Sequence, residues 1–352
     1  MAATSRLSSI YLLLVLNALK VSFLFIGAII GAGFASGREI ALYFSAANTA
    51  TVLLAALLIG AFCCFFLLLG KLDNQNGGAA PYPAKQKGGF AAHLRYAKRG
   101  VNFLVILSSA VTFIAMCAGA ETLFRQAFGV PYIGLISGLM AAVMSVFSMN
   151  ALKSASLFLV PLILLTCLIL FVSGMPFTSS AAHNFDPYNA LNYTAMNMML
   201  GGFLIRNQGA KMRGKHIVLT GVITAATLAA ALFMMYAIVS VYPEAELPLF
   251  DYALAQNLSS AAAVIIFLAI FTTQLSAAKI IAAAAARQRV NDLACVIFLA
   301  ALAALTFKYS FKGIVDATYP IVGAIGLAFL ALALLEPLTV PPNRQRKRLT
   351  LS

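Results

Sequence analysis

The 352-residue sequence has no tryptophan and little charge, since only 10% of its residues are Asp, Glu, Lys or Arg. Soluble domains contain about 25% charged residues, so this chain lacks the polar surface that water requires. Hydrophobic residues make up 62% of the chain and form repeated runs. These runs are long enough to cross the hydrocarbon core of a bilayer, which is about 30 Å thick. The sequence therefore predicts an integral membrane protein.

The chain also lacks the residue patterns of common enzymes. Its three histidines lie far apart in the sequence, and no HExxH, CxxC or GxSxG motif is present. The segment GAGFASG (31–37) has no strand before it, as a dinucleotide site would need, and no Walker motif supports ATP-driven pumping. We expect the protein not to be an enzyme and to use no cofactor.

Cysteine and acidic residues are both scarce. The five cysteines lie inside apolar runs, which predicts buried thiols and no disulfide framework or zinc site. Basic residues outnumber acidic ones by 24 to 10. They cluster in short loops between the apolar runs, a pattern that indicates membrane topology and not nucleic-acid binding.

The apolar runs predict ten membrane spans. In chain order they cover residues 11–44, 51–69, 101–128, 132–150, 154–173, 189–207, 216–241, 259–286, 292–307 and 313–335. Lys and Arg concentrate in the loops after spans two, six and eight and in the tail at 338–352, whereas loops 175–188 and 242–258 contain none. The positive-inside rule therefore predicts that both termini lie in the cytoplasm. No loop is large enough to be a separate soluble domain, so residues 1–352 are expected to form one transmembrane domain.

The first span is too long for the bilayer. Residues 11–44 would extend about 51 Å as one helix at 1.5 Å per residue, against a hydrocarbon core of about 30 Å. Gly27, Gly31 and Gly33 lie near its middle, and glycine is the poorest helix former after proline. The length and the glycines together predict a break in the helix near the middle of the membrane.

A second interpretation of these glycines is helix packing. Gly27 and Gly31 form a GxxxG motif, which lets two unbroken helices approach closely. Gly33, Ala35 and Gly37 follow at once, so small residues surround the helix instead of forming one stripe, and this favours the break. Backbone that is unwound at membrane depth must be buried or line a cavity. Its freed carbonyls suit a cation, and the N-terminus of a half-helix suits a carboxylate.

The stretch FIGAIIGAGFASGREI (25–40) closely resembles the signature of the YkvI-type bacterial membrane proteins of the amino acid–polyamine–organocation transporter superfamily. The stretches YTAMN (193–197), FLAIFTTQLSAA (267–278) and YPIVGAIGLAFL (319–330) resemble the same family. The resemblance covers essentially the whole chain. It implies an all-α, five-plus-five inverted-repeat fold with spans one and six unwound, and repeats at about 8–174 and 189–337.

The resemblance also implies a sodium site, because sodium-coupled transporters of this fold hold the ion between the span-one break and span eight. The matching residues are the carbonyls of Gly27, Ile30 and Ala269 and the hydroxyls of Thr272 and Thr273. Neutral oxygens are suitable ligands for a hard monovalent cation. The alternative is that the threonines bond back to carbonyls one turn earlier. Some proton-coupled relatives replace the cation with a lysine on span five, and span five has none here.

The solute is expected between the breaks of spans one and six. The candidate residues are Ala28, Gly31, Ala32 and Gly33 on the first span and Tyr193, Asn197, Gly201 and Gly202 on the sixth. Gly201 and Gly202 mark the expected second break. Tyr193 and Asn197 would present polar groups to the solute, and the alternative for both is an ordinary hydrogen bond between helices.

Two carboxylates within the spans are candidates for gating or proton transfer, because intramembrane acids are costly and often functional. Glu39 is expected about 12 Å beyond Gly31, toward the outer mouth, with Arg38 pointing elsewhere. Glu121 is four residues before Arg125, so the alternative there is a local ion pair.

These observations predict a secondary transporter for a small polar or zwitterionic solute of the amino-acid kind. The expected mechanism is sodium symport by alternating access. Proton coupling through Glu39 or Glu121 is the alternative within transport. A sensor that binds a solute without moving it is the alternative outside transport. The sequence specifies no oligomeric state and predicts no partner beyond the solute and the bilayer.

Overall fold

The computed structural model describes residues 2–75, 89–147, 150–174, 184–210 and 212–339. Within these ranges the chain forms helices joined by short connections, and it forms no strand. The helices are α1 (Ala2–Ile29), α2 (Ala32–Ser36), α3 (Arg38–Phe44), α4 (Thr49–Gln75), α5 (Gly89–Phe128), α6 (Ile133–Ser145), α7 (Asn150–Gly174), α8 (Pro187–Gly209), α9 (Gly214–Val239), α10 (Pro248–Ala255), α11 (Ser259–Arg287), α12 (Asp292–Ala304) and α13 (Phe311–Leu335), with 3-10 turns η1 (Leu305–Lys308) and η2 (Glu336–Thr339).

The helices confirm the predicted all-α membrane fold. Among the described residues, five are long and apolar enough to cross a bilayer: α4, α9, α11, α13 and the Phe103–Phe128 part of α5. Shorter apolar helices lie at Val15–Ile29, Ile133–Ser145, Leu159–Gly174 and Asp292–Ala304. Each predicted span corresponds to one of these helices or to α8, the first being divided into α1, α2 and α3. The loop at 76–88 and most of the basic tail lie outside the described residues.

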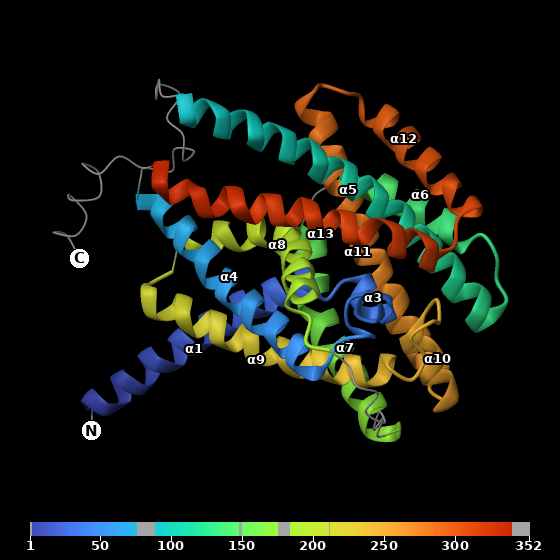
Figure 1. Ribbon diagram of the computed structural model, residues 1–352, viewed down its shortest axis with the longest axis horizontal. Coiled ribbons are helices and arrows are strands. Elements are labelled where there is room, and N and C mark those ends of the chain that lie inside the picture. The colour runs from blue at the N-terminus through green and yellow to red at the C-terminus, as the bar shows by residue number, and fades with distance from the viewer. Residues whose placement is uncertain (1, 76–88, 148–149, 175–183, 211, 340–352) are drawn as a thin grey trace.

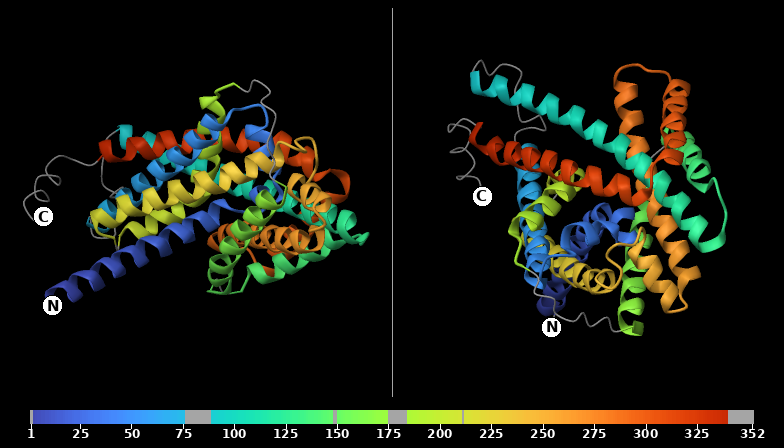
Figure 2. Two further views of the ribbon diagram at one scale, coloured as in Figure 1. Left: turned by 90° about the horizontal axis from the view of Figure 1, so that it is seen from below. Right: turned by 45° about the vertical axis from the view of Figure 1, so that its right-hand side comes forward.

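The helices pack as two groups (Figures 1 and 2). The first group contains α1 to α4, α8 and α9, with α4 packed against both α8 and α9. The second group contains α5, α6, α11 and α12. Helix α13 contacts α8 of the first group and α5 of the second, and α7 contacts α1, α9 and α11. Helix α2, the short helix after the break, packs directly on α11, so the break lies where the two groups meet.

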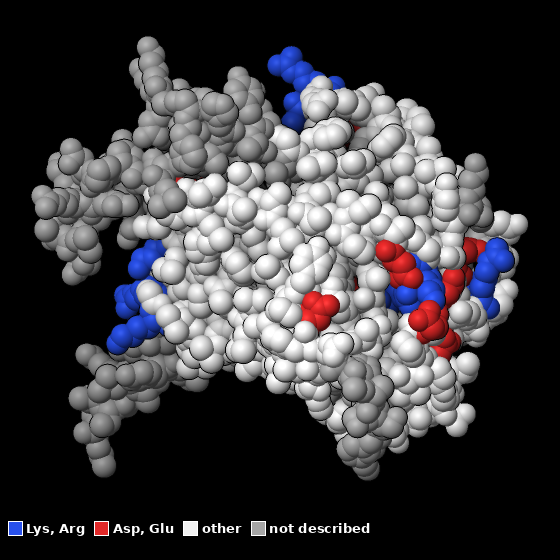
Figure 3. Space-filling model, in the orientation of Figure 1, with Lys and Arg blue, Asp and Glu red and all other residues white. Residues whose placement is uncertain are grey.

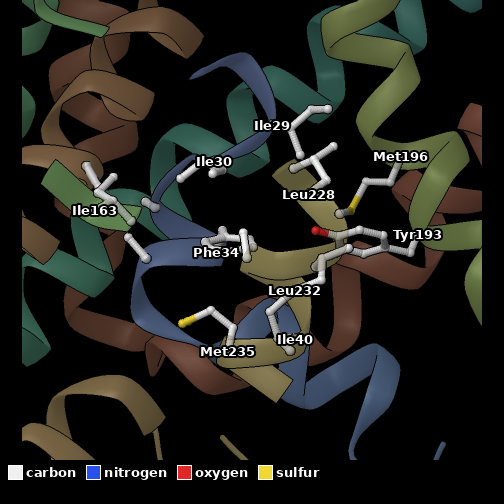
Figure 4. Packing of buried hydrophobic residues seen from close by; sticks show 14 of the residues in the cluster. Ile29, Ile30, Phe34, Ile40, Ile163, Tyr193, Met196, Leu228, Leu232 and Met235 are labelled. Atoms are coloured by element: carbon white, nitrogen blue, oxygen red, sulfur yellow. The ribbon is translucent and has the colours of Figure 1, made fainter. Parts of the chain in front are cut away.

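Each group has a buried apolar core. The larger core surrounds the break, where Ile29, Ile30 and Phe34 meet Leu228 and Leu232 of α9 (Figure 4). The smaller core lies within the second group and includes cysteine side chains from α5 and α12. All five cysteines are free thiols, four of them buried, as their apolar contexts predicted.

The predicted break in the sixth span is wrong. Helix α8 runs without interruption from Pro187 to Gly209, through both Gly201 and Gly202. These glycines serve packing instead. A Cβ on Gly201 would lie 2.6 Å from the ring of Phe25, and one on Gly202 would lie 3.1 Å from the ring of Phe66. The missing side chains therefore make room for two aromatic rings of α1 and α4, and the α8 backbone keeps its helical hydrogen bonds.

Helices α4 and α8 also touch through their backbones. A Cβ on Gly70 of α4 would overlap the carbonyl oxygen of Arg206, and a Cβ on Gly209 of α8 would overlap the carbonyl oxygen of Leu67. Two glycines thus bring the same two helices together at the same end. Because a backbone carbonyl cannot turn aside as a side chain can, this contact holds α4 and α8 as one unit.

Helix α10 is an element that the sequence did not predict. It lies in the loop expected at 242–258 and begins at Pro248, a residue well suited to the first helical turn. Its side chains Leu249, Phe250 and Tyr252 are buried, and the helix packs on α2, α9 and α11. The segment is helical because this apolar face covers the half-helices that follow the break.

The two ends of the molecule differ in charge. The start of α1 and the end of α13 lie at one end, as an even number of crossings requires (Figure 1). Most of the acidic atoms visible in Figure 3 lie at the opposite end. This distribution agrees with the pattern of basic loops in the sequence, and the cytoplasmic placement of the termini stays a prediction.

Replacing Gly70 with alanine tests the contact between α4 and α8. Alanine favours a helix more than glycine does, by about 1 kcal/mol, so a purely local effect would stabilise the protein. We expect instead a lower melting temperature for the purified protein in detergent, because overpacking a well-packed site costs about 1–3 kcal/mol. Gly214→Ala is the matched control, since a Cβ there has no atom within 4 Å. Equal melting temperatures for the two variants would show that the close approach is wrong.

Candidate functional site

The first span is broken at the position that the sequence indicated. Helix α1 ends at Ile29 and α2 begins at Ala32, so Ile30 and Gly31 lie outside both helices. Gly31 has extended backbone angles, φ −93° and ψ −164°. At the break, Ile30 is buried and Gly31 is half-buried between the two helix groups, which fits irregular backbone at membrane depth because it must be buried or line a cavity.

Thr273 of α11 faces this break. Its hydroxyl oxygen accepts a hydrogen bond of 3.0 Å from the backbone N–H of Ala32, the first residue of α2. A Cβ on Gly31 would lie 2.9 Å from the same oxygen, so only glycine fits there without a shift. The threonine caps a helix that has no capping side chain of its own.

The break releases two carbonyls of the last turn of α1. In a continuous helix, the N–H groups of Gly31 and Ala32 would bond the carbonyls of Gly27 and Ala28. Here the Gly31 N–H donates to the Ile29 carbonyl at 2.8 Å, and the Ala32 N–H donates to Thr273. The carbonyl of Gly27, one of the predicted cation ligands, is therefore freed from the helix.

Thr272, the neighbouring predicted ligand, is bonded within its own helix. Its hydroxyl donates to the carbonyl of Ala269 at 3.0 Å, which is the local alternative that applies to intramembrane threonines. The hydroxyl oxygen still has lone pairs that can accept. The structure thus keeps Ala269 and Thr272 together on α11 and brings Thr273, one residue on, into contact with the first span.

Glu39 does not lie at the outer mouth, contrary to the sequence-based expectation. Gly37 adopts φ +82°, a left-handed conformation that suits glycine, and ends α2 one residue before α3 begins. The chain therefore bends, and the Glu39 side chain folds back onto Gly33. A Cβ on Gly33 would overlap Oε2 of Glu39, and the glutamate is only 5% exposed. The expectation failed because it treated residues 31–39 as one straight helix.

The buried Glu39 carboxylate brings several predicted residues together. The side-chain amide of Asn197 on α8 donates to Oε1 of Glu39 at 3.5 Å and to the Tyr193 carbonyl at 3.0 Å. The Tyr193 side chain is fully buried beside them. Gly33, Tyr193 and Asn197, all predicted as solute ligands, thus meet at Glu39.

Two tyrosines that the sequence did not single out complete this cluster. Tyr43, one turn after Glu39 on α3, donates its hydroxyl to the Tyr319 carbonyl on α13 at 2.9 Å, and its ring lies 5.5 Å from that of Tyr193. The Tyr319 hydroxyl would lie 3.2 Å from a Cβ on Gly33. The spacing of Glu39 and Tyr43 on one helix face was a usable signal, and the position of Tyr319 depends on the tertiary fold.

Arg38, the residue before Glu39, joins neighbouring elements at the acidic end of the molecule. Its guanidinium forms a two-pronged ion pair with Asp316 of α13, with Nε donating to Oδ1 at 2.8 Å, and Nη1 donates to the Pro243 carbonyl at 2.7 Å. A more exposed pair, Lys312 with Glu244, lies beside it at 2.6 Å, and this hydrogen bond holds the pKa of the Glu244 carboxyl below its usual range. Arg38 thus joins α3 to α13 and to the loop before α10.

A second arginine joins helices at the opposite end. Arg206 of α8 pairs with Asp73 of α4 at 2.7 Å and with Glu336, which directly follows α13, also at 2.7 Å. Helix α13 is therefore bound near each of its ends by an arginine of the first helix group.

Glu121 has a structural environment. It pairs with Arg125 one turn later at 2.7 Å, as its spacing suggested, and its two oxygens accept from the N–H groups of Tyr132 and Gly134 at 3.0 Å each. The carboxylate therefore satisfies the start of α6, where unpaired N–H groups favour a negative charge.

Of the predicted solute ligands, those on the first span lie at the break and those on the sixth divide into two sets. Ala28, Gly31 and Ala32 flank the break itself. Asn197 and Tyr193 lie in the Glu39 cluster, whereas the two glycines of α8 pack against aromatic rings.

Comparison with known proteins identifies the fold. No protein-family model matches the chain. The chain is 25% identical over 350 residues to the uncharacterized membrane protein YkvI of Bacillus subtilis (strain 168), a match that covers 90% of this chain and 95% of YkvI. Mhp1, a nucleobase-cation-symport-1 family transporter, in a closed conformation with bromovinylhydantoin bound, matches with a TM-score of 0.57 and 12% identity over 91% of this chain and 76% of Mhp1. The chain has the fold of Mhp1.

An inward-facing conformation of Mhp1 matches almost equally, with a TM-score of 0.55 and 11% identity over 90% of this chain and 75% of Mhp1. The Mhp1 fold confirms the expected helical membrane architecture. Because Mhp1 is a transporter, the match agrees with the expectation that the chain is not an enzyme. The superfamily assignment and the repeat boundaries stay predictions.

Neutralising Asp316 tests the contribution of the Arg38 ion pair. In Asp316→Asn the buried guanidinium loses its anionic partner, and charge-assisted hydrogen bonds of this kind contribute about 1–3 kcal/mol. We expect a lower melting temperature in detergent. Glu244→Gln is the matched control, because the Glu244 side chain is 88% exposed and exposed pairs contribute little. The same loss in both variants would contradict a special role for Arg38 with Asp316.

Proposed function

We propose that the protein is a secondary active transporter that moves a small polar or zwitterionic solute, of the amino-acid kind, together with Na⁺ across a bacterial inner membrane. The observation that carries this proposal is the break at Ile30 and Gly31, capped by Thr273 from the other helix group. Such a break is costly in lipid and persists where backbone groups serve as ligands. The fold shared with the transporter Mhp1 supports the same conclusion.

The proposed cation ligands are neutral oxygens from the two helix groups. The carbonyls of Gly27 and Ile30 belong to the first group, and Ala269, Thr272 and Thr273 belong to the second. Oxygen donors without charge suit a hard monovalent cation. An ion bound by both groups would favour conformations in which α1 and α11 stay together, which is how binding energy at one site biases a conformational equilibrium.

The proposed solute position is next to the cation, on the other side of α2. Gly33 lies there against Glu39, and Asn197 and Tyr193 of α8 supply polar side chains. Helix α2 lies between the proposed cation and solute positions. Binding at one position would therefore change the affinity of the other, and this coupling is reciprocal.

One observation favours proton coupling as a second candidate. Glu39 is buried within the first span, accepts a long hydrogen bond of 3.5 Å from Asn197, and takes part in no ion pair among the described residues. A buried carboxylate without a cationic partner is costly unless it takes up a proton. Glu121 is a weaker candidate for this role, since Arg125 and two backbone N–H groups already occupy its oxygens.

Removing the Thr273 hydroxyl tests the sodium assignment. We expect Na⁺, in place of choline, to raise the melting temperature of the wild-type protein and of Thr273→Ser, because a bound ion stabilises the folded state. Thr273→Ala should lose this rise and the sodium-stimulated uptake of amino acids into proteoliposomes. Thr166→Ala is the control, since that hydroxyl bonds only to Leu162 within its own helix.

Sodium stimulation that survives in Thr273→Ala would show that the cation site is wrong. Uptake that ignores sodium but stops when the pH gradient is collapsed would favour the proton-coupled candidate.

A further inference from the structure

The Glu39 cluster contains a negative charge without a counter-charge. The glutamate is 5% exposed, and it takes part in no ion pair among the described residues. Arg38, its neighbour in sequence, is committed to Asp316 and points away from it. A buried carboxylate in this state lacks the partner that would offset its lost hydration.

The α8 side of the cluster also contains a buried hydroxyl without a hydrogen bond of standard geometry. It belongs to the fully buried Tyr193, which lies beside Glu39 and Asn197. The side-chain oxygen of Asn192 also has no partner, but it lies against Gly323 of α13 and not at Glu39. Buried polar groups without partners are uncommon in native proteins and call for an explanation such as an absent ligand.

Three tyrosines from three helices lie around the Glu39 carboxylate. Tyr43 of α3 and Tyr193 of α8 pack edge to face with ring centroids 5.5 Å apart. Tyr319 of α13 brings its hydroxyl to Gly33, on the side where Oε2 of Glu39 lies. Tyrosine faces attract cations through the ring quadrupole. The tyrosine rings therefore favour a positive charge at this site, as the Glu39 carboxylate does.

These properties together specify the missing ligand. An alkylammonium group carries one positive charge and three N–H donors. It can neutralise the carboxylate and donate to the carboxylate oxygens and to the Tyr193 hydroxyl in one binding event. A proton alone would neutralise Glu39 but bring a single donor.

We infer that Glu39, with the hydroxyl of Tyr193, binds the protonated amino group of the transported solute. The inference rests on the proposed transport function and narrows it to solutes that carry a free amine. The Arg38–Asp316 ion pair lies one turn before Tyr319 on α13 and covers this site from the acidic end of the molecule.

Binding to the purified full-length protein in detergent tests the inference without any gradient. The probes are methylammonium chloride and the common amino acids, each amino acid paired with its N-acetyl derivative, which keeps the carboxylate and loses the positive charge. We expect free amines to raise the melting temperature of the wild type and the N-acetyl derivatives to leave it unchanged.

Two variants at the site and one control test whether amines bind at Glu39. Glu39→Gln keeps the shape of the side chain and should weaken amine binding at least tenfold, while the unliganded protein stays folded because a buried charge has been removed. Tyr193→Phe should weaken it several-fold. Glu244→Gln, on an exposed acid at the same end, should leave binding unchanged.

The inference is overturned if no amine stabilises the wild type, or if Glu39→Gln binds amines as well as the wild type does. Retained amine binding in Glu39→Gln, with loss of uptake driven by a pH gradient, would instead assign Glu39 to proton transfer. Amine binding without flux in proteoliposomes would overturn transport and leave the amine site standing. If N-acetyl derivatives are transported as fast as free amines, the amine site is overturned and the transport function stands.

Discussion

The unwound turn at Ile30 and Gly31 is the constraint on which the rest of the structure depends. Lipid offers no hydrogen bonds, so a helix interrupted at membrane depth needs partners from its own protein. Thr273 supplies one of them from α11, and α10 covers the half-helices with its apolar face. The turn is therefore also the joint of the molecule, because the helix that starts there belongs to one group while its cap belongs to the other.

The charges are arranged around this joint in a consistent way. Asp316 lies near the start of α13 and Glu336 just beyond its end, a separation of about 30 Å at 1.5 Å per residue, close to the thickness of the hydrocarbon core. Each is paired with an arginine of the first helix group, Arg38 or Arg206. Between these two points α13 contributes a tyrosine to the Glu39 cluster. Helix α13 thus contacts the first helix group near both membrane faces and also at the buried Glu39 cluster.

The sequence predicted what depends on segment averages and missed what depends on contacts. The spans follow from hydropathy, and the break follows from length and glycine content, so both could be predicted. Gly201 and Gly202 look the same whether they unwind a helix or admit a ring, and only the position of Phe25 and Phe66 decides between these roles. The burial of Glu39 depends on the left-handed Gly37, a conformation that sequence permits but does not require.

The continuity of α8 has a consequence for how such a protein evolves. At the broken helix the groups available to an ion or solute are main-chain atoms, which no substitution can exchange. Helix α8 offers side chains only, among them Asn192, Tyr193 and Asn197. Under the proposed function, mutation can therefore alter solute preference one residue at a time along α8 and leave the main-chain part of the centre unchanged. Related chains that share the broken helix would then diverge in selectivity through this single face.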